Sequence, residues 1–391
     1  MSNTLSHQRV RRAAFSAVSL AGGVSLAVIP AATLAISARV FTLAETGVIA
    51  VAIMVATFVG QLTFAAVVES RLSSRTAERR VIFPVWLAAL SLVAALVVAL
   101  NYRNAVVLCI ALPVLVASLE VGRGVSVAER LDRREIWASA FVGAGALIGV
   151  LSAFAGSDWG LIPVAAGIFA ATCVRLIPVP HAASHRETSA TVWVMADVGI
   201  TGIVFPLLNT LILTVLGPAE AVLFTAISTV SGLLAIPLNF LRLRLLKEHS
   251  RSDVWVSVGS LLLAVLALLA FEALGFFSLL FGSSWTIQST LLPLLAACAW
   301  RAASLAPTLP FTALRRMGLA RLVTILRAGA SAAAFSLASL ALVSQNIAWV
   351  FAALLLAELL SGVVYEIARR RVVRAEALGQ PDRATSLGGP T

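Results

Sequence analysis

The sequence predicts an all-α integral membrane protein with about 12 transmembrane helices. Of its 391 residues, 60% are apolar and only 12% are charged, which is about half the charged share of an ordinary soluble domain. A soluble globule needs a more polar surface, and a disordered chain needs few apolar residues and much charge. Because a helix needs about 20 apolar residues to cross the hydrocarbon core, this length holds about a dozen crossings and no sizeable water-soluble domain.

The expected spans are apolar runs separated by charged clusters. They cover residues 13–37, 45–69, 81–101, 104–122, 136–155, 159–178, 192–216, 219–241, 254–275, 287–312, 319–343 and 347–368. The first run follows Arg9, Arg11 and Arg12, as the core of a signal peptide does, but it is longer than such a core. We therefore expect a retained first span, with a cleaved signal as the alternative.

The basic residues predict the orientation of the chain. The N-terminus, the even-numbered loops and the C-terminal tail hold 25 of the 29 Lys and Arg residues. The odd-numbered loops and their borders hold only Arg39 and Arg103, and two further arginines lie inside spans. Lys and Arg accumulate on the cytoplasmic side of membrane proteins, so we expect both termini in the cytoplasm.

A polar connector divides the chain near its middle. We expect a cytoplasmic N-terminus at 1–12, an N-terminal six-helix lobe at 13–178, a cytoplasmic connector at 179–191, a C-terminal six-helix lobe at 192–368 and a basic, disordered cytoplasmic tail at 369–391. Each lobe begins with a long helix that contains a proline, Pro30 or Pro206. Two parallel six-helix lobes around a central cavity are a common plan among transporters.

Two short segments resemble a known family. Residues 39–47, RVFTLAETG, resemble the "R-hydrophobic…E-x-G" connection of polysaccharide-transporter flippases. Phe281-Gly282 and the later Arg315-Arg316-Met317-Gly318 are similar to the start and end of that family's tenth helix. These flippases belong to the multidrug/oligosaccharidyl-lipid/polysaccharide (MOP) exporter superfamily. The chain departs from the family in being shorter than most members, with clipped loops.

The resemblance implies a fold, a location and an activity. The fold would be that of a MOP exporter, in the bacterial cytoplasmic membrane. The protein would flip a lipid-linked oligosaccharide or polysaccharide precursor across this membrane by alternating access. Its partners would then be the anionic head group of that glycolipid and the membrane lipids, with no nucleic acid, and we expect a monomer.

Four ionisable side chains lie deep in the expected spans: Asp197, Arg301, Arg327 and Glu358. Such residues are functional candidates by default, and the planar guanidinium of arginine suits phosphate. With Arg39 at the outer end of the first span, the substrate-binding candidates are Arg39, Asp197, Arg301 and Arg327. The alternative is structural pairing of Arg301 with Glu358 and of Arg327 with Asp197, since the four charges sum to zero, and interfacial snorkelling for Arg39.

No motif in the sequence indicates an enzyme, a cofactor or a metal site. GxxxxGK[ST], GxSxG and HExxH are absent. His181 and His185 have the spacing of a helical metal pair, but two prolines precede them and no third ligand is near.

The sequence also allows other functions. A different MOP-type exporter or a major-facilitator exporter is the first alternative, although the loop at 69–75 lacks the major-facilitator signature and the first six spans lack a deep acid. A membrane glycan polymerase or glycosyltransferase would need a much larger loop than this chain has. A non-transporting membrane scaffold is the last alternative.

Overall fold

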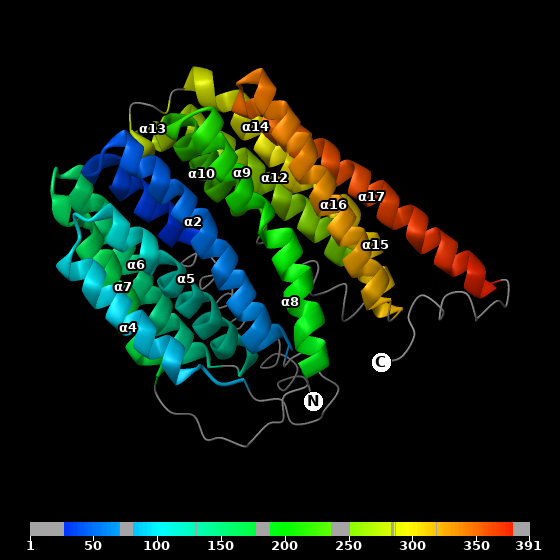
Figure 1. Ribbon diagram of the computed structural model, residues 1–391, viewed down its shortest axis with the longest axis horizontal. Coiled ribbons are helices and arrows are strands. Elements are labelled where there is room, and N and C mark those ends of the chain that lie inside the picture. The colour runs from blue at the N-terminus through cyan, green and yellow to red at the C-terminus, as the bar shows by residue number, and fades with distance from the viewer. Residues whose placement is uncertain are drawn as a thin grey trace, which may run out of the picture. The chain divides into compact units, whose positions relative to one another are not determined.

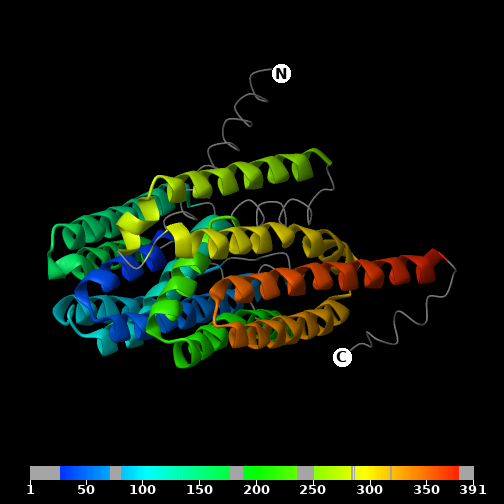
Figure 2. The same ribbon diagram turned by 90° about the horizontal axis from the view of Figure 1, so that it is seen from above.

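Helices dominate the computed structural model, which describes residues 27–70, 81–129, 131–176, 188–235, 251–282, 285, 287–317 and 319–377 (Figures 1 and 2). These residues contain no strand. The arginines at 9–12, the loop at 71–80 and the connector with His181 and His185 lie outside this part of the chain. The prediction of an all-α fold is confirmed.

Every expected span coincides with a helix over the residues of it that the structure describes. In chain order these are Ala27–Val40, α2 (Leu43–Phe64) with a π-helical turn at Ala65–Glu69, α4 (Val85–Leu100), α5 (Ala105–Ala128), α6 (Asp132–Phe154), α7 (Leu161–Arg175), α8 (Thr188–Gly202), α9 (Val204–Val215), α10 (Pro218–Gly232), α12 (Arg251–Ala273), α13 (Phe276–Phe281), α14 (Ile287–Ala303), α15 (Leu305–Arg316), α16 (Ala320–Ala341) and α17 (Ile347–Ala377). Within the described ranges, eight helical segments are long and apolar enough to cross a membrane, and three shorter ones are also apolar.

The structure differs from the expected spans at three places. The seventh and tenth spans are each broken, into α8 and α9 and into α14 and α15. The arginine-rich loop expected after residue 122 is largely helical, because α5 and α6 extend into it. The tail expected from residue 369 begins as helix, since α17 continues to Ala377.

The helices group into two compact units. The first contains the helices up to α9 and the start of α10, to Ala226, and the second contains the end of α10 and α12 to α17. The division between these units does not fall at the connector 179–191. The expected pair of six-helix lobes around a cavity stays a prediction.

In the first unit, glycines bring α6 and α7 into backbone contact. A methyl group on Gly145 would lie 2.4 Å from the carbonyl oxygen of Pro163, and one on Gly149 would lie 2.4 Å from that of Gly160. Small residues spaced four apart allow this close approach of membrane helices. We call Gly145, Gly149, Gly160 and Pro163 together the glycine seam.

We expect Gly145→Ala to destabilise the protein by about 1–3 kcal/mol, because the added methyl group overpacks the glycine seam against rigid backbone. Gly143→Ala on the same helix is the matched control, since no atom lies within 4 Å of a methyl group there. That change should be neutral or stabilising by up to about 1 kcal/mol, as alanine favours helix over glycine. Thermal unfolding of both purified variants in detergent measures the difference, and equal melting temperatures would contradict the seam.

In the second unit, α17 packs against α14, α15 and α16. A small core joins α15, α16 and α17, with Phe311 and Tyr365 in edge-to-face contact at 5.9 Å between ring centroids. This packing holds the side chains of α14 and α17 in a fixed relation, and those helices carry the charged residues described next.

Candidate functional site

The tenth span is interrupted near its middle. The α-helix α14 ends at Ala303, Ser304 forms a turn, and α15 begins at Leu305. Proline lacks the N–H that a helix needs, so Pro307 and Pro310 leave the carbonyl groups of Ala303 and Ala306 without their usual helical partners. The backbone N–H of Ser304 still bonds to the carbonyl oxygen of Trp300 at 3.3 Å, so the turn bends the span without separating its two halves.

Glu358 of α17 faces this break. Its carboxylate lies near the side chains of Trp300 and Ser304 and interacts electrostatically with Arg301 and Arg327. The Ser304 hydroxyl also donates to the carbonyl oxygen of Trp300 at 3.4 Å. The guanidinium of Arg301 stacks over the ring of Trp300, with 4.0 Å from Cζ to the centroid. We call Trp300, Arg301, Ser304, Arg327 and Glu358 the span-ten cluster.

The span-ten cluster has a net positive formal charge. Two arginines interact with a single glutamate, and Arg327 also lies over the ring of Phe311 at 4.9 Å. A guanidinium at this depth costs several kcal/mol unless charge, hydrogen bonds or water compensate it. An anionic group that entered this region would meet two planar donors whose geometry suits phosphate or carboxylate.

The structure brings together only some of the predicted site residues. Arg301 and Arg327 lie in the second unit around the same glutamate. Asp197 lies on α8 and is 2% exposed. It belongs to the first unit and Arg327 to the second, so the pairing of these two residues stays a prediction. Arg39 donates a hydrogen bond of 2.9 Å to the carbonyl oxygen of Ala35 and covers the ring of Phe154 at 4.1 Å.

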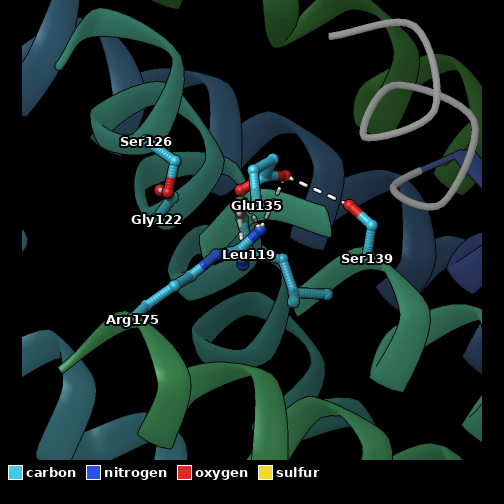
Figure 3. A network of polar contacts seen from close by, with 6 residues as sticks. All are labelled: Leu119, Gly122, Ser126, Glu135, Ser139 and Arg175. Carbon is cyan, nitrogen blue, oxygen red and sulfur yellow. Dashed lines mark hydrogen bonds and ion pairs between the residues drawn. The ribbon is translucent and has the colours of Figure 1, made fainter. Parts of the chain in front are cut away.

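A second charged cluster in the first unit was missed by sequence reasoning. Arg175 Nη2 lies 3.1 Å from both carboxylate oxygens of Glu135, and both side chains are almost fully buried (Figure 3). Arg175 also donates to the carbonyl oxygen of Leu119 at 3.3 Å, and Ser139 donates to Glu135. Arg175 lies in the last turn of α7, close to the polar connector that begins at residue 179.

Gly122 makes room for this ion pair. A methyl group at Gly122 would lie 2.5 Å from Cδ of Arg175, so only glycine lets the arginine pass α5 to reach Glu135 on α6. The pair therefore fastens three helices of the first unit to one another.

Glu272 is a further buried acid that sequence reasoning did not single out. It lies at the end of α12, is 1% exposed, and accepts hydrogen bonds from Trp285 Nε1 at 2.8 Å and from Thr290 Oγ1 at 2.5 Å. The sequence offered one indication that Glu272 is buried: it stands near the end of an apolar run and has no charged residue beside it. These bonds tie the end of α12 to Trp285 and, through Thr290, to α14.

Comparison with solved structures identifies the fold. A structure described as a MATE in complex with MaL6 superposes with a TM-score of 0.56 at 13% identity and covers 93% of this chain and 96% of its own. An outward-facing multidrug resistance MATE family transporter of the MOP superfamily gives 0.54 at 14% identity over 95% and 96%. A MATE in the straight conformation gives 0.52 at 14% identity over 93% and 96%.

The sequence itself gives no such match. No protein-family model and no curated protein matches this chain. At identities of 12–14% the similarity concerns the fold alone. The chain thus has the fold of the MATE transporters of the MOP superfamily over nearly its whole length.

Proposed function

We propose that this protein is a membrane transporter of the MOP-exporter type that works by alternating access. The main support is the MATE fold, which extends over at least 93% of the chain and of each of the compared transporters. A turn inside a span with ionisable residues beside it, as at Ser304, is a second support, because interrupted helices hold the substrate in many secondary transporters.

We further propose that the cargo is an amphipathic anion, with a lipid-linked oligosaccharide or polysaccharide precursor as the first candidate. The span-ten cluster supports an anion, because two arginines interact there with one glutamate. The RVFTLAETG segment at 39–47, which resembles the flippase connection, supports a glycolipid. We propose the bacterial cytoplasmic membrane as the location, with both termini inside.

Loss of the protein is expected to leave its lipid-linked glycan on the cytoplasmic leaflet. Labelling of that glycan with an impermeant lectin on intact cells, before and after deletion of the gene, measures its distribution between the leaflets. Complementation with the unmodified gene should restore outer labelling, and Arg103→Gln should restore it equally, because Arg103 is an exposed residue paired with Asp158 outside the cluster.

A small-molecule exporter is the second candidate function, favoured by the multidrug resistance transporter among the compared structures. An unchanged distribution of the lipid-linked glycan, in a strain without another flippase, would contradict glycolipid transport. If that strain also accumulates a fluorescent anionic drug, the second function replaces the first.

A further inference from the structure

The last helix carries a lipid-facing stripe that ends in arginines. Five of its exposed apolar side chains recur at helical spacing along one face: Trp349, Leu356, Leu360, Val363 and Ile367. Leu359 and Val364 lie at the borders of this face and are also exposed. At 3.6 residues per turn, Arg371 and Arg374 continue the same face. Both are exposed. The opposite face is buried, with Phe351, Leu354 and Tyr365 in the core of the second unit.

The length of this stripe matches a membrane. Trp349, 62% exposed, lies near the start of α17, and tryptophan accumulates at membrane interfaces. About 20 residues separate it from Arg370, a rise of about 30 Å, which is the thickness of the hydrocarbon core. The arginines on this face therefore fall at the depth of the opposite head groups.

The C-terminal end of α17 carries more arginines than acidic residues. Glu366 accepts hydrogen bonds from Arg369 at 2.8 and 2.7 Å and from Nε of Arg370 at 2.7 Å. The terminal nitrogens of Arg370, whose side chain is 67% exposed, take no part in these bonds. The stretch 366–376 contains four arginines and two glutamates. The second glutamate is residue 376, and its side chain is not among those that the structure describes.

We propose that Arg370, Arg371 and Arg374 form a binding site for the phosphate of anionic phospholipids on the C-terminal side of the membrane. The acyl chains of the bound lipid lie along the stripe from Leu356 to Ile367, and its phosphate accepts hydrogen bonds from the arginines. The end of α17 projects past the start of α16 (Figures 1 and 2), and the side chains of Arg370, Arg371 and Arg374 are exposed. The site is independent of the transported substrate.

Lipid competition on the full-length protein tests this site. The purified protein in mild detergent is incubated with equal amounts of dioleoyl phosphatidylglycerol and phosphatidylcholine, and native mass spectrometry measures the ratio of the two lipids bound. The unmodified protein should favour phosphatidylglycerol. The double change Arg371→Gln and Arg374→Gln should lower this preference about thirtyfold, as each arginine near an anionic surface contributes about 1 kcal/mol.

Two variants serve as controls. Arg371→Lys with Arg374→Lys should keep most of the preference, because the charge remains. Arg103→Gln removes an exposed arginine elsewhere and should leave the ratio unchanged. An unchanged ratio in the double glutamine variant, or an equal loss in Arg103→Gln, would overturn the site.

Salt gives a second measurement that needs no variant. Raising NaCl from about 50 mM to about 500 mM should reduce the preference of the unmodified protein, since exposed charges are screened over a few Å at high ionic strength. A preference that is absent at low salt, or that does not respond to salt, would overturn the proposal even if the glutamine variant did not fold. Displacement of phosphatidylglycerol by inorganic pyrophosphate at equal ionic strength would assign the arginines to a soluble phosphate instead.

Discussion

Glu358→Ala is expected to destabilise the protein by about 3–5 kcal/mol, because it leaves the positive charge of the span-ten cluster without its carboxylate. Arg301→Ala should have a similar effect, as it leaves Glu358 with one fewer counter-charge and removes the stacking on Trp300. The double change Arg301→Met and Glu358→Met should recover much of the loss, since well-packed apolar groups replace a buried ion pair at little cost. Thermal unfolding in detergent gives the three values.

The same variants separate binding from structure. If Arg301 contacts an anionic substrate, Arg301→Lys should keep partial transport, because the charge survives while the planar fork is lost. The double methionine variant should then be stable but inactive. A double variant that is stable and still transports would remove Arg301 from substrate binding. Arg103→Ala is the matched control for thermal unfolding. The ion pair between Arg103 and Asp158 is largely exposed and should contribute only about 0–1 kcal/mol to the free energy of unfolding.

Arg175→Met is expected to cost about 3–5 kcal/mol in the first unit, because it leaves the carboxylate of Glu135 buried without its partner. The side chains are only 4% and 2% exposed, so water cannot replace the lost hydrogen bonds. Glu135→Gln should cost less, since the amide oxygen still accepts from Arg175. A double-mutant cycle on thermal unfolding should give a coupling energy of about 2–3 kcal/mol.

Gly122→Ala reaches the same ion pair from a third helix. The added methyl group displaces Arg175 without removing any charge, so we expect a loss close to that of Arg175→Met and little further loss when the two changes are combined. Additive losses for Gly122→Ala and Arg175→Met would show that Gly122 acts through another contact.

Sequence reasoning predicted the spans because the membrane imposes one strong requirement on composition. Each apolar run of about 20 residues corresponds to a helix, whatever its packing partners are. The break at Ser304 was missed, although Pro307 and Pro310 were visible, since prolines are also tolerated in unbroken membrane helices. The extension of α17 to Ala377 was missed because arginines reduce hydropathy without disfavouring helix.

The charged clusters were harder to predict, because they depend on which helices become neighbours. Arg301 and Glu358 could be considered as a pair from their depth and from the zero sum of the deep charges, and in the structure the two interact electrostatically. Arg175 and Glu135 are 40 residues apart in sequence, and each stands beside loop-like polar residues. Nothing local distinguishes such residues from solvated charges until the contact between α6 and α7 is known.

The glycine seam restricts which parts of the first unit can move. Two helices that touch through backbone atoms cannot slide past each other, because no flexible side chains lie between them to change rotamer. We expect α6 and α7 to travel as a single rigid body during any conformational cycle and to exchange their amide hydrogens slowly. Bending is then left to spans that contain a turn and a proline, such as the seventh span, where Ile203 forms a turn and Pro206 offers no N–H to the carbonyl group of Gly202, so that a few torsion angles can absorb the change.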